Sequence, residues 1–229
     1  VVFQNDLSFS GVVQPWEEAH IGSGVPARID RILVDVGDFV NRGDLLVQMD
    51  RTQLFQAKIQ KQTLEADLKR MDTLLQMGAV TQQNYDQLKA QYDIAVSTIE
   101  NLTPNTEVRA TIPGVITGRY NSEGEIFSMT PGPAGKPAIL SIMQIDPVKV
   151  TIGVSERYFN QVKKGQQAVV STEVFPGRSF NGRVGRIHPT IDRMSGTFKV
   201  EITIDNKDRS LKPGMFTRVE LNLGEASGL

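Results

Sequence analysis

The chain has 229 residues, of which 39% are hydrophobic and 22% charged, a composition typical of a soluble, folded protein. Its formal net charge of −1 excludes a broad basic face, so any electrostatic recognition of a partner must be local. The absence of cysteine excludes disulfides and thiolate chemistry, and no stretch approaches the ~20 apolar residues that span a bilayer.

The N-terminal part of the chain has the patterning of short β-strands. Residues 6–15 alternate apolar and polar side chains, which predicts a strand with Leu7, Phe9, Gly11 and Val13 on one buried face. From residue 17 to residue 50 the strands are shorter. They are separated by turn signals at Gly37-Asp38 and Gly43-Asp44.

The hydrophobic period then changes from two to about three and a half, which predicts two helices. Residues 51–77 contain neither proline nor glycine, and Gly78 follows at a C-cap-like position. Thr81 can cap a second helix, which we expect to end before Pro104. The short link makes the helices an antiparallel hairpin. We expect the residues between them to be Leu54, Ala57, Leu64, Leu68, Met71 and Leu75, with one interruption at Lys61, and Tyr85, Leu88, Tyr92, Ala95, Ile99 and Leu102.

The glycine-punctuated pattern returns after the helices and repeats the first one at a constant offset. Each half is too short to bury a core alone, so we expect the two halves to pack together as one domain, interrupted by the hairpin. The first copy contains Pro26, Ile29, Gly37, Asp38, Phe39 and Val40. Their counterparts are Pro113, Ile116, Gly124, Glu125, Ile126 and Phe127.

The last third of the chain alternates more regularly, which predicts a small β-barrel. A short helix over residues 156–164, capped by Ser155 and stopped by Gly165, is expected to cover one open end. The N-terminal strand is expected to pair with this barrel. The side chains predicted to share its inner face are Val148, Val150, Ile152 and Val154; Ala168, Val170, Thr172 and Val174; Phe198, Val200, Ile202 and Ile204; and Thr217, Val219, Leu221 and Leu223.

Three stretches of the sequence carry a family resemblance. The half-motif from Val34 to Leu45, with its second copy, resembles half of a biotinyl or lipoyl carrier domain, but the hairpin stands where a carrier shows its modifiable lysine. Together with residues 182–206 and the Leu-Lys-Pro-Gly-Met run at 211–215, this resembles the periplasmic adaptors, or membrane fusion proteins of HlyD/RND type, of tripartite efflux pumps.

The resemblance implies a mainly β fold with an α-helical hairpin. In it, a lipoyl-like split β-domain is interrupted by an antiparallel coiled-coil hairpin and joined to a small β-barrel with one short helix. The expected boundaries are residues 1–15 for an N-terminal strand of the barrel, 16–50 and 103–146 for the two lipoyl-like halves, 51–102 for the hairpin, 147–224 for the barrel, and 225–229 for a tail or the start of a missing membrane-proximal region.

The family also implies a docking motif at the hairpin tip. Adaptors that dock on TolC-type channels carry Arg, Leu and Ser at a spacing that Arg70, Leu74 and Thr81 reproduce here, with threonine in place of serine. Leu75 fits the inner heptad phase, so its neighbour Leu74 is expected to point outward. A guanidinium at Arg70 can grip carbonyls or carboxylates of a partner helix pair. Thr81 can serve as both helix cap and contact.

The implied function is a link between an inner-membrane transporter, of RND type, and an outer-membrane TolC-type channel in a Gram-negative bacterium. The adaptor would form a ring, expected to be a hexamer, in the periplasm. It would be attached to the inner membrane through an N-terminal anchor outside this sequence. An adaptor of an ABC-type exporter or of a type I secretion system is the nearest alternative.

We expect neither enzymatic activity nor a cofactor, metal or nucleic-acid partner. His20 and His188 are far apart in the sequence and lack further ligands at metal-binding spacing. A lipoyl or biotinyl carrier is a second hypothesis, but it requires a lysine between the half-motifs. A cytoplasmic coiled-coil module is a third.

Overall fold

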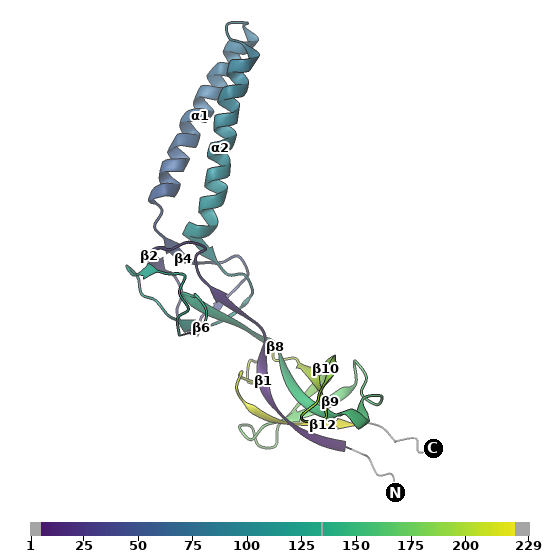
Figure 1. Cartoon of the computed structure of the whole chain (residues 1–229). Helices are drawn as coiled ribbons and strands as arrows, with labels where there is room; N and C mark the ends of the chain where they lie inside the picture. Colours follow the sequence, from purple (N-terminus) through teal and green to yellow (C-terminus); the bar gives the residue numbers. More distant parts are fainter. Residues whose placement is uncertain (1–5, 134, 223–229) are drawn as a thin grey trace. The chain divides into compact units, whose positions relative to one another are not determined.

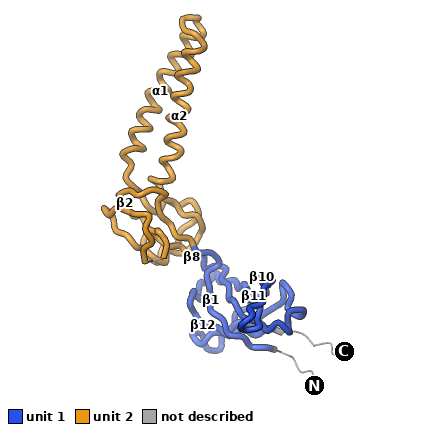
Figure 2. The backbone as a smooth tube through the Cα atoms, in the orientation of Figure 1, with its two compact units in different colours: residues 1–18, 143–229 blue, residues 19–142 orange. Residues whose placement is uncertain are grey.

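The computed structural model describes residues 6–133 and 135–222, so the predictions for Leu223 and for residues 225–229 lie outside the described part. The chain divides into two units, which are coloured in Figure 2. Unit 1 comprises residues 1–18 and 143–229, and unit 2 comprises residues 19–142. The structure is mostly strand with two long helices, as the sequence predicted (Figure 1).

Unit 1 is built around a sheet that closes on itself, which we call the closed sheet. Its strands follow one another in the order β1-β12-β9-β10-β11-β8, and β1 also pairs with β8. Closure leaves no open edge between these strands. Their bounds are β1 Asp6–Ile21, β8 Leu140–Ser155, β9 Gln167–Ser171, β10 Ser179–Asp192, β11 Thr197–Ile204 and β12 Phe216–Asn222.

The inner face of the closed sheet follows the period of two seen in the sequence. The prediction for Val174 is wrong, because β9 ends at Ser171 and this side chain lies exposed in the following turn. The other predicted inner residues are buried: Val148, Val150, Ile152, Val154, Ala168, Val170, Thr172, Phe198, Val200, Ile202, Ile204, Thr217, Val219 and Leu221.

The helix predicted for residues 156–164 is also wrong. Only Glu156–Tyr158 forms a single 3₁₀ turn, and the Ser155 side chain makes no cap hydrogen bond. So short a segment has little helical stability of its own, and tertiary packing sets its backbone. The ring of Phe159 lies edge-on to Phe198, 5.0 Å between centroids, and Val162 is buried.

Unit 2 holds the two repeated halves and the helical hairpin (Figure 1). The strands of the first half lie before the helices and those of the second half after them. Their bounds are β2 Ala27–Ile32, β3 Phe39–Val40 and β4 Leu45–Met49, then helices α1 Thr52–Gln76 and α2 Gln82–Thr106, then β5 Glu107–Arg109, β6 Gly114–Arg119 and β7 Ile126–Phe127.

The two halves of unit 2 exchange backbone hydrogen bonds in a reciprocal pattern. The Ile29 N–H donates to the Glu125 carbonyl (2.8 Å), and the Gly124 N–H donates to the Ile29 carbonyl (2.7 Å). The equivalent atoms of the other copy repeat this pattern. The Gly37 N–H donates to the Ile116 carbonyl, and the Ile116 N–H donates to the Asp38 carbonyl, both at 2.9 Å. Strand pairing follows the same rule, since β2 pairs with β7 and β3 with β6. The repeat in the sequence is therefore a repeat in the fold.

The base of the hairpin is tied to this core by strands on both sides. Strand β4 leads into α1 and pairs with β5, which follows α2, so that Gln48 lies opposite Glu107. At the start of α1, Asp50 accepts hydrogen bonds from the hydroxyl and backbone N–H of Thr52 (2.7 and 2.8 Å). These bonds lower the pKa of the Asp50 carboxyl.

The predicted end of the second helix is wrong by one turn, since α2 continues through Pro104 to Thr106. Proline removes one backbone donor, but near a helix end little of the ladder remains to be lost. Side chains supply other bonds there. The Asn105 amide donates to the Asn101 carbonyl (3.1 Å), and the Thr106 hydroxyl donates to the Leu102 carbonyl (3.0 Å).

The contact between α1 and α2 follows the predicted heptad seam. Leu54, Ala57 and Ala95 are buried, and the other seam residues are half-buried. Lys61, the one interruption, places its ammonium 5.9 Å from the centre of the Tyr92 ring, a cation–π distance. A lysine is thus accommodated within the seam.

Asn206 is a buried polar residue that ties the 211–215 loop to the start of β8. Its side-chain amide donates to the carbonyls of Ile145 (2.7 Å) and Leu211 (2.8 Å), and its carbonyl oxygen accepts the Leu211 N–H (3.0 Å). Its backbone N–H donates to Asp146 (3.0 Å). The carbonyls of Ile145 and Leu211 and the Leu211 N–H would lose these partners if the side chain were removed, whereas the backbone bond to Asp146 would remain.

We therefore expect Asn206→Ala to lower the free energy of unfolding by about 3 kcal/mol, because it leaves several buried groups unsatisfied. Urea denaturation of the whole chain measures this. Asp205→Ala changes an exposed neighbour and serves as the control. A loss below about 1 kcal/mol in Asn206→Ala would contradict the role we assign to this residue.

Candidate interaction site at the hairpin tip

The hairpin tip is shaped by a glycine-dependent helix end. Gly78 has a φ of +68°, which glycine adopts without steric cost. Its N–H donates to the Leu75 carbonyl (2.9 Å), and the Ala79 N–H donates to the Leu74 carbonyl (2.9 Å), the two bonds of a Schellman motif. The predicted helix stop at Gly78 is confirmed.

Thr81 begins α2 as its N-cap, also as predicted. Its backbone is extended (φ −85°, ψ 154°), and its hydroxyl accepts the Asn84 N–H at 3.3 Å. The cap satisfies one of the free N–H groups in the first turn of the helix. The side chain is exposed.

Arg70 and Leu74 lie one turn apart on α1, so they share a face of that helix. The side chain of Arg70 is 75% exposed, and among the described residues its one ion pair is with Asp67, three residues earlier on α1, at 3.4 Å. Exposed pairs of this kind contribute little stability, so Arg70 can change partners at low cost. Leu74 is 41% exposed, whereas Leu75 is half-buried in the seam. The predicted outward orientation of Leu74 is confirmed.

Neighbouring polar groups at the tip are paired locally. The Gln76 amide donates to Asp72 (3.0 Å), and the Gln82 amide donates to Asp86 (2.8 Å). Met77, next to the turn, is strongly exposed and was not identified from the sequence, although it falls outside the heptad seam. Arg70, Leu74, Met77 and Thr81 therefore offer a guanidinium, apolar side chains and a hydroxyl at the tip.

This set of groups suits contact with another protein. Within the described ranges, no group of three or more histidine, aspartate or glutamate residues could hold a metal ion. Of the two histidines, His20 shares a hydrogen bond with the Ser141 hydroxyl and His188 with the Glu201 carboxylate, both at 2.9 Å.

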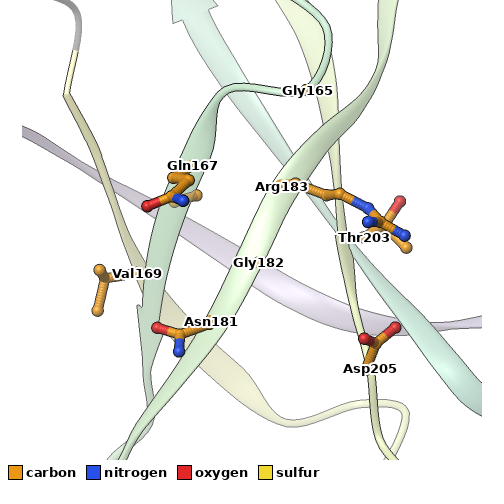
Figure 3. Close-up of a pocket in the computed structure, with 9 residues that line it drawn as sticks. Gly165, Gln167, Val169, Asn181, Gly182, Arg183, Thr203 and Asp205 are labelled. Carbon is orange, nitrogen blue, oxygen red and sulfur yellow. The ribbon is translucent and has the colours of Figure 1, made fainter.

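A second candidate for a functional site is a polar cleft of about 420 Å³ on strands β9, β10 and β11. Gln167, Asn181, Arg183, Thr203 and Asp205 are among the side chains that line it (Figure 3). Four of these five side chains are exposed and Thr203 is half-buried. None of the five is therefore a buried polar group that would require a ligand as its hydrogen-bond partner. None of the sequence-predicted site residues lines it.

None of the helices in the described part of the chain has the length and apolar character that a bilayer crossing requires.

Comparison with known proteins places this geometry in a family. Residues 147–225 match the family model described as "CusB-like, beta-barrel domain". The chain is 30% identical to the "Nodulation protein NolF" of Rhizobium meliloti over 96% of this chain and 64% of that protein. It is 24% identical to the "Multidrug resistance protein MdtA" of Xenorhabdus bovienii over 93% and 57%.

A solved structure has a similar fold over almost the whole length of this chain. The chimera of MacA with the α-hairpin domain of Pseudomonas aeruginosa MexA superposes with a TM-score of 0.78, at 19% identity, over 97% of this chain and 80% of that one. At this identity the likeness shows the fold alone. The chain is therefore similar to proteins named for membrane fusion and for drug or cation efflux. It spans roughly three fifths of the length of the curated relatives named here.

The cap at the tip gives a direct structural prediction. Thr81→Ala removes the acceptor of the Asn84 N–H, so we expect it to destabilise the start of α2 by about 1 kcal/mol. Amide exchange at Asn84 should become several-fold faster, while exchange at Ala95, mid-helix, stays unchanged. Thr81→Ser keeps the acceptor and should exchange like the wild type. Equal exchange rates in Thr81→Ala and Thr81→Ser would contradict the capping role.

Proposed function

We propose that this chain is a periplasmic adaptor that links an inner-membrane efflux transporter of RND type to a TolC-type outer-membrane channel. The observation that carries the proposal is the tip, where Arg70 and Leu74 point away from the helix seam. The family supports an efflux role, and relatives are named for multidrug resistance and cation efflux. The name of the matched model, which refers to RND systems, favours that transporter class over an ABC-type partner.

The split core of unit 2 supports the same proposal. Its reciprocal halves resemble a lipoyl-like domain, and the hairpin occupies the point at which a carrier would present its lysine. The acyl- or carboxyl-carrier hypothesis has no residue to support it. The docking surface is then the hairpin tip. The adaptor role implies that the protein lies in the periplasm, attached to the inner membrane.

Docking would use two physically different contacts. The Arg70 guanidinium can exchange its weak bond to Asp67 for carbonyls or a carboxylate of the channel, and its planar fork allows two bonds at once. Burying the exposed part of Leu74 adds on the order of 1 kcal/mol per contact, which a ring multiplies. Thr81 adds a hydroxyl beside them.

We expect Arg70→Asp and Leu74→Asp each to abolish drug resistance in an efflux complementation assay, because each places a carboxylate in the contact. Protein level and melting temperature should stay near wild type, since both side chains lie outside the seam. Lys69→Asp is the matched control, because Lys69 lies on another side of α1 and pairs only with Glu65 (3.4 Å). Full drug resistance in both tip variants would contradict the docking role of the tip.

A second set of exposed apolar residues on the hairpin suits contact between copies of the chain in the proposed ring, which we expect to be a hexamer. Phe55 and Ile59 lie one turn apart on α1 outside the seam, and Ile94 is exposed on α2. Ile59 is 64% and Ile94 67% exposed, which is unusual for isoleucine in an isolated hairpin. Packing α1 of one copy against α2 of the next would cover them. The two helices alone are a marginal coiled coil, which such neighbours would stabilise.

The double variant Ile59→Asp, Ile94→Asp should therefore weaken self-association of the chain by at least about tenfold, since each isoleucine contributes roughly 1.5–3 kcal/mol when buried. Sedimentation equilibrium over a range of concentrations measures this. Asp86→Asn and Asp93→Asn, on the same hairpin, serve as a control for changed charge. Association constants equal to wild type in the double variant would exclude this surface from the ring contact.

A further inference from the structure

One end of the closed sheet carries several basic side chains together with exposed apolar groups. We call it the basic end and define it as residues 155–166 together with residues 191–199. The two segments are adjacent, because the Glu156 N–H donates to the Gly196 carbonyl (3.0 Å). The Phe159 ring on Phe198 holds the first segment against the sheet. Both segments are therefore parts of a single surface.

The basic end carries local positive charge in a chain whose net charge is −1. Its two segments contain five basic and two acidic residues, a difference of +3, and all seven are exposed. Within the described ranges, the side chains of Lys163, Lys164 and Arg193 take part in no ion pair. The basic residues are Arg157, Lys163, Lys164, Arg193 and Lys199; the acidic ones are Glu156 and Asp192.

Apolar side chains project from the same surface. Met194, in the turn between β10 and β11, is 100% exposed, and Ile191 and Phe159 are also exposed. The turn is well built: the Asp192 carboxylate accepts the backbone N–H groups of Met194 (2.8 Å) and Ser195 (3.2 Å). Met194 is thus held outward by a fixed turn, and no described residue of unit 1 covers it.

The first described residue of β1 and the last described residue of β12 also lie toward this end of the closed sheet. Strand β1 starts at Asp6, which pairs with Asn222 of β12. Strand β8 runs antiparallel to β1, because Thr151 contacts Gln14 and Lys149, earlier in β8, contacts Trp16, later in β1. The end of β8 at Ser155, where the basic end begins, therefore lies toward Asp6.

We propose that the basic end binds the surface of a membrane that contains anionic phospholipid. The unpaired lysines are point charges on flexible stems, which suit mobile phosphate headgroups better than a stereospecific protein contact. The guanidinium of Arg193 can bind a phosphate through two bonds at once. Met194, with Ile191 beside it, would enter the boundary between headgroups and acyl chains, as apolar residues among basic ones do in interfacial segments. This contact is separate from the hairpin tip and does not depend on the proposed docking to a channel.

Cosedimentation of the 229-residue chain with vesicles tests the proposal. We expect binding to vesicles of phosphatidylcholine mixed with phosphatidylglycerol, weaker binding as salt is raised, and none to phosphatidylcholine alone. Arg193→Glu changes the local charge by two and should weaken binding about 30-fold, given a factor of about five per charge near an anionic surface. Met194→Asp should weaken binding roughly tenfold, because it removes the inserting side chain and adds a negative charge.

Two matched variants outside unit 1 separate the surface from general charge effects. Lys89→Glu and Met129→Asp make the same kinds of change at exposed positions of unit 2, and both should bind vesicles like the wild type. Equal losses in Arg193→Glu and Lys89→Glu would overturn the proposal. So would an absence of binding to the anionic vesicles at low ionic strength, which would leave an acidic protein surface as the partner of the basic end.

Discussion

The reciprocal hydrogen bonding between the two halves of unit 2 is the constraint on which the arrangement of this protein depends. Each glycine–acidic turn is bonded to the isoleucine of the other copy, at Ile29 and Ile116, and both isoleucines are fully buried. Neither half can satisfy these backbone groups alone, and a buried unpaired group is costly. The halves must therefore meet, however long the segment between them.

This constraint explains how a long helical insertion is tolerated. The strands β4 and β5 pair directly before and after the hairpin, so its two ends are already held side by side by the sheet. The helices then need only a weak seam of their own, and most seam residues remain half-buried. Stability is concentrated in the sheets, and the tip is left free to serve as a contact surface whose side chains contribute little to folding.

Much of this organisation was predictable from the sequence because it depends on periodicity. The constant offset between the copies, the heptad seam and the cap at Thr81 are local or repetitive signals, and the structure contains all three. The errors occur where packing or side-chain bonding overrides propensity. Packing of Phe159 and Val162 replaces the expected helix by a 3₁₀ turn, and threonine and asparagine side chains carry α2 past Pro104.

Exposure was the other limit of sequence reasoning. Leu74 could be placed outside the seam because Leu75 fits it, and Met77 also falls outside the seam, but Met194 has no periodic neighbours that reveal its exposure. The basic end likewise joins two segments about thirty residues apart, which only the closed sheet brings together. Because the net charge of the whole chain is only −1, composition did not indicate this local positive charge.

Site-specific photocrosslinking in cells tests the docking role of the tip most directly. A photoreactive amino acid at position 74 in the full-length protein should crosslink to the outer-membrane channel, whereas the same group at the seam position 75 should not. Crosslinks to the channel from neither position, or equally from both, would contradict the placement of the working surface at Arg70, Leu74 and Thr81.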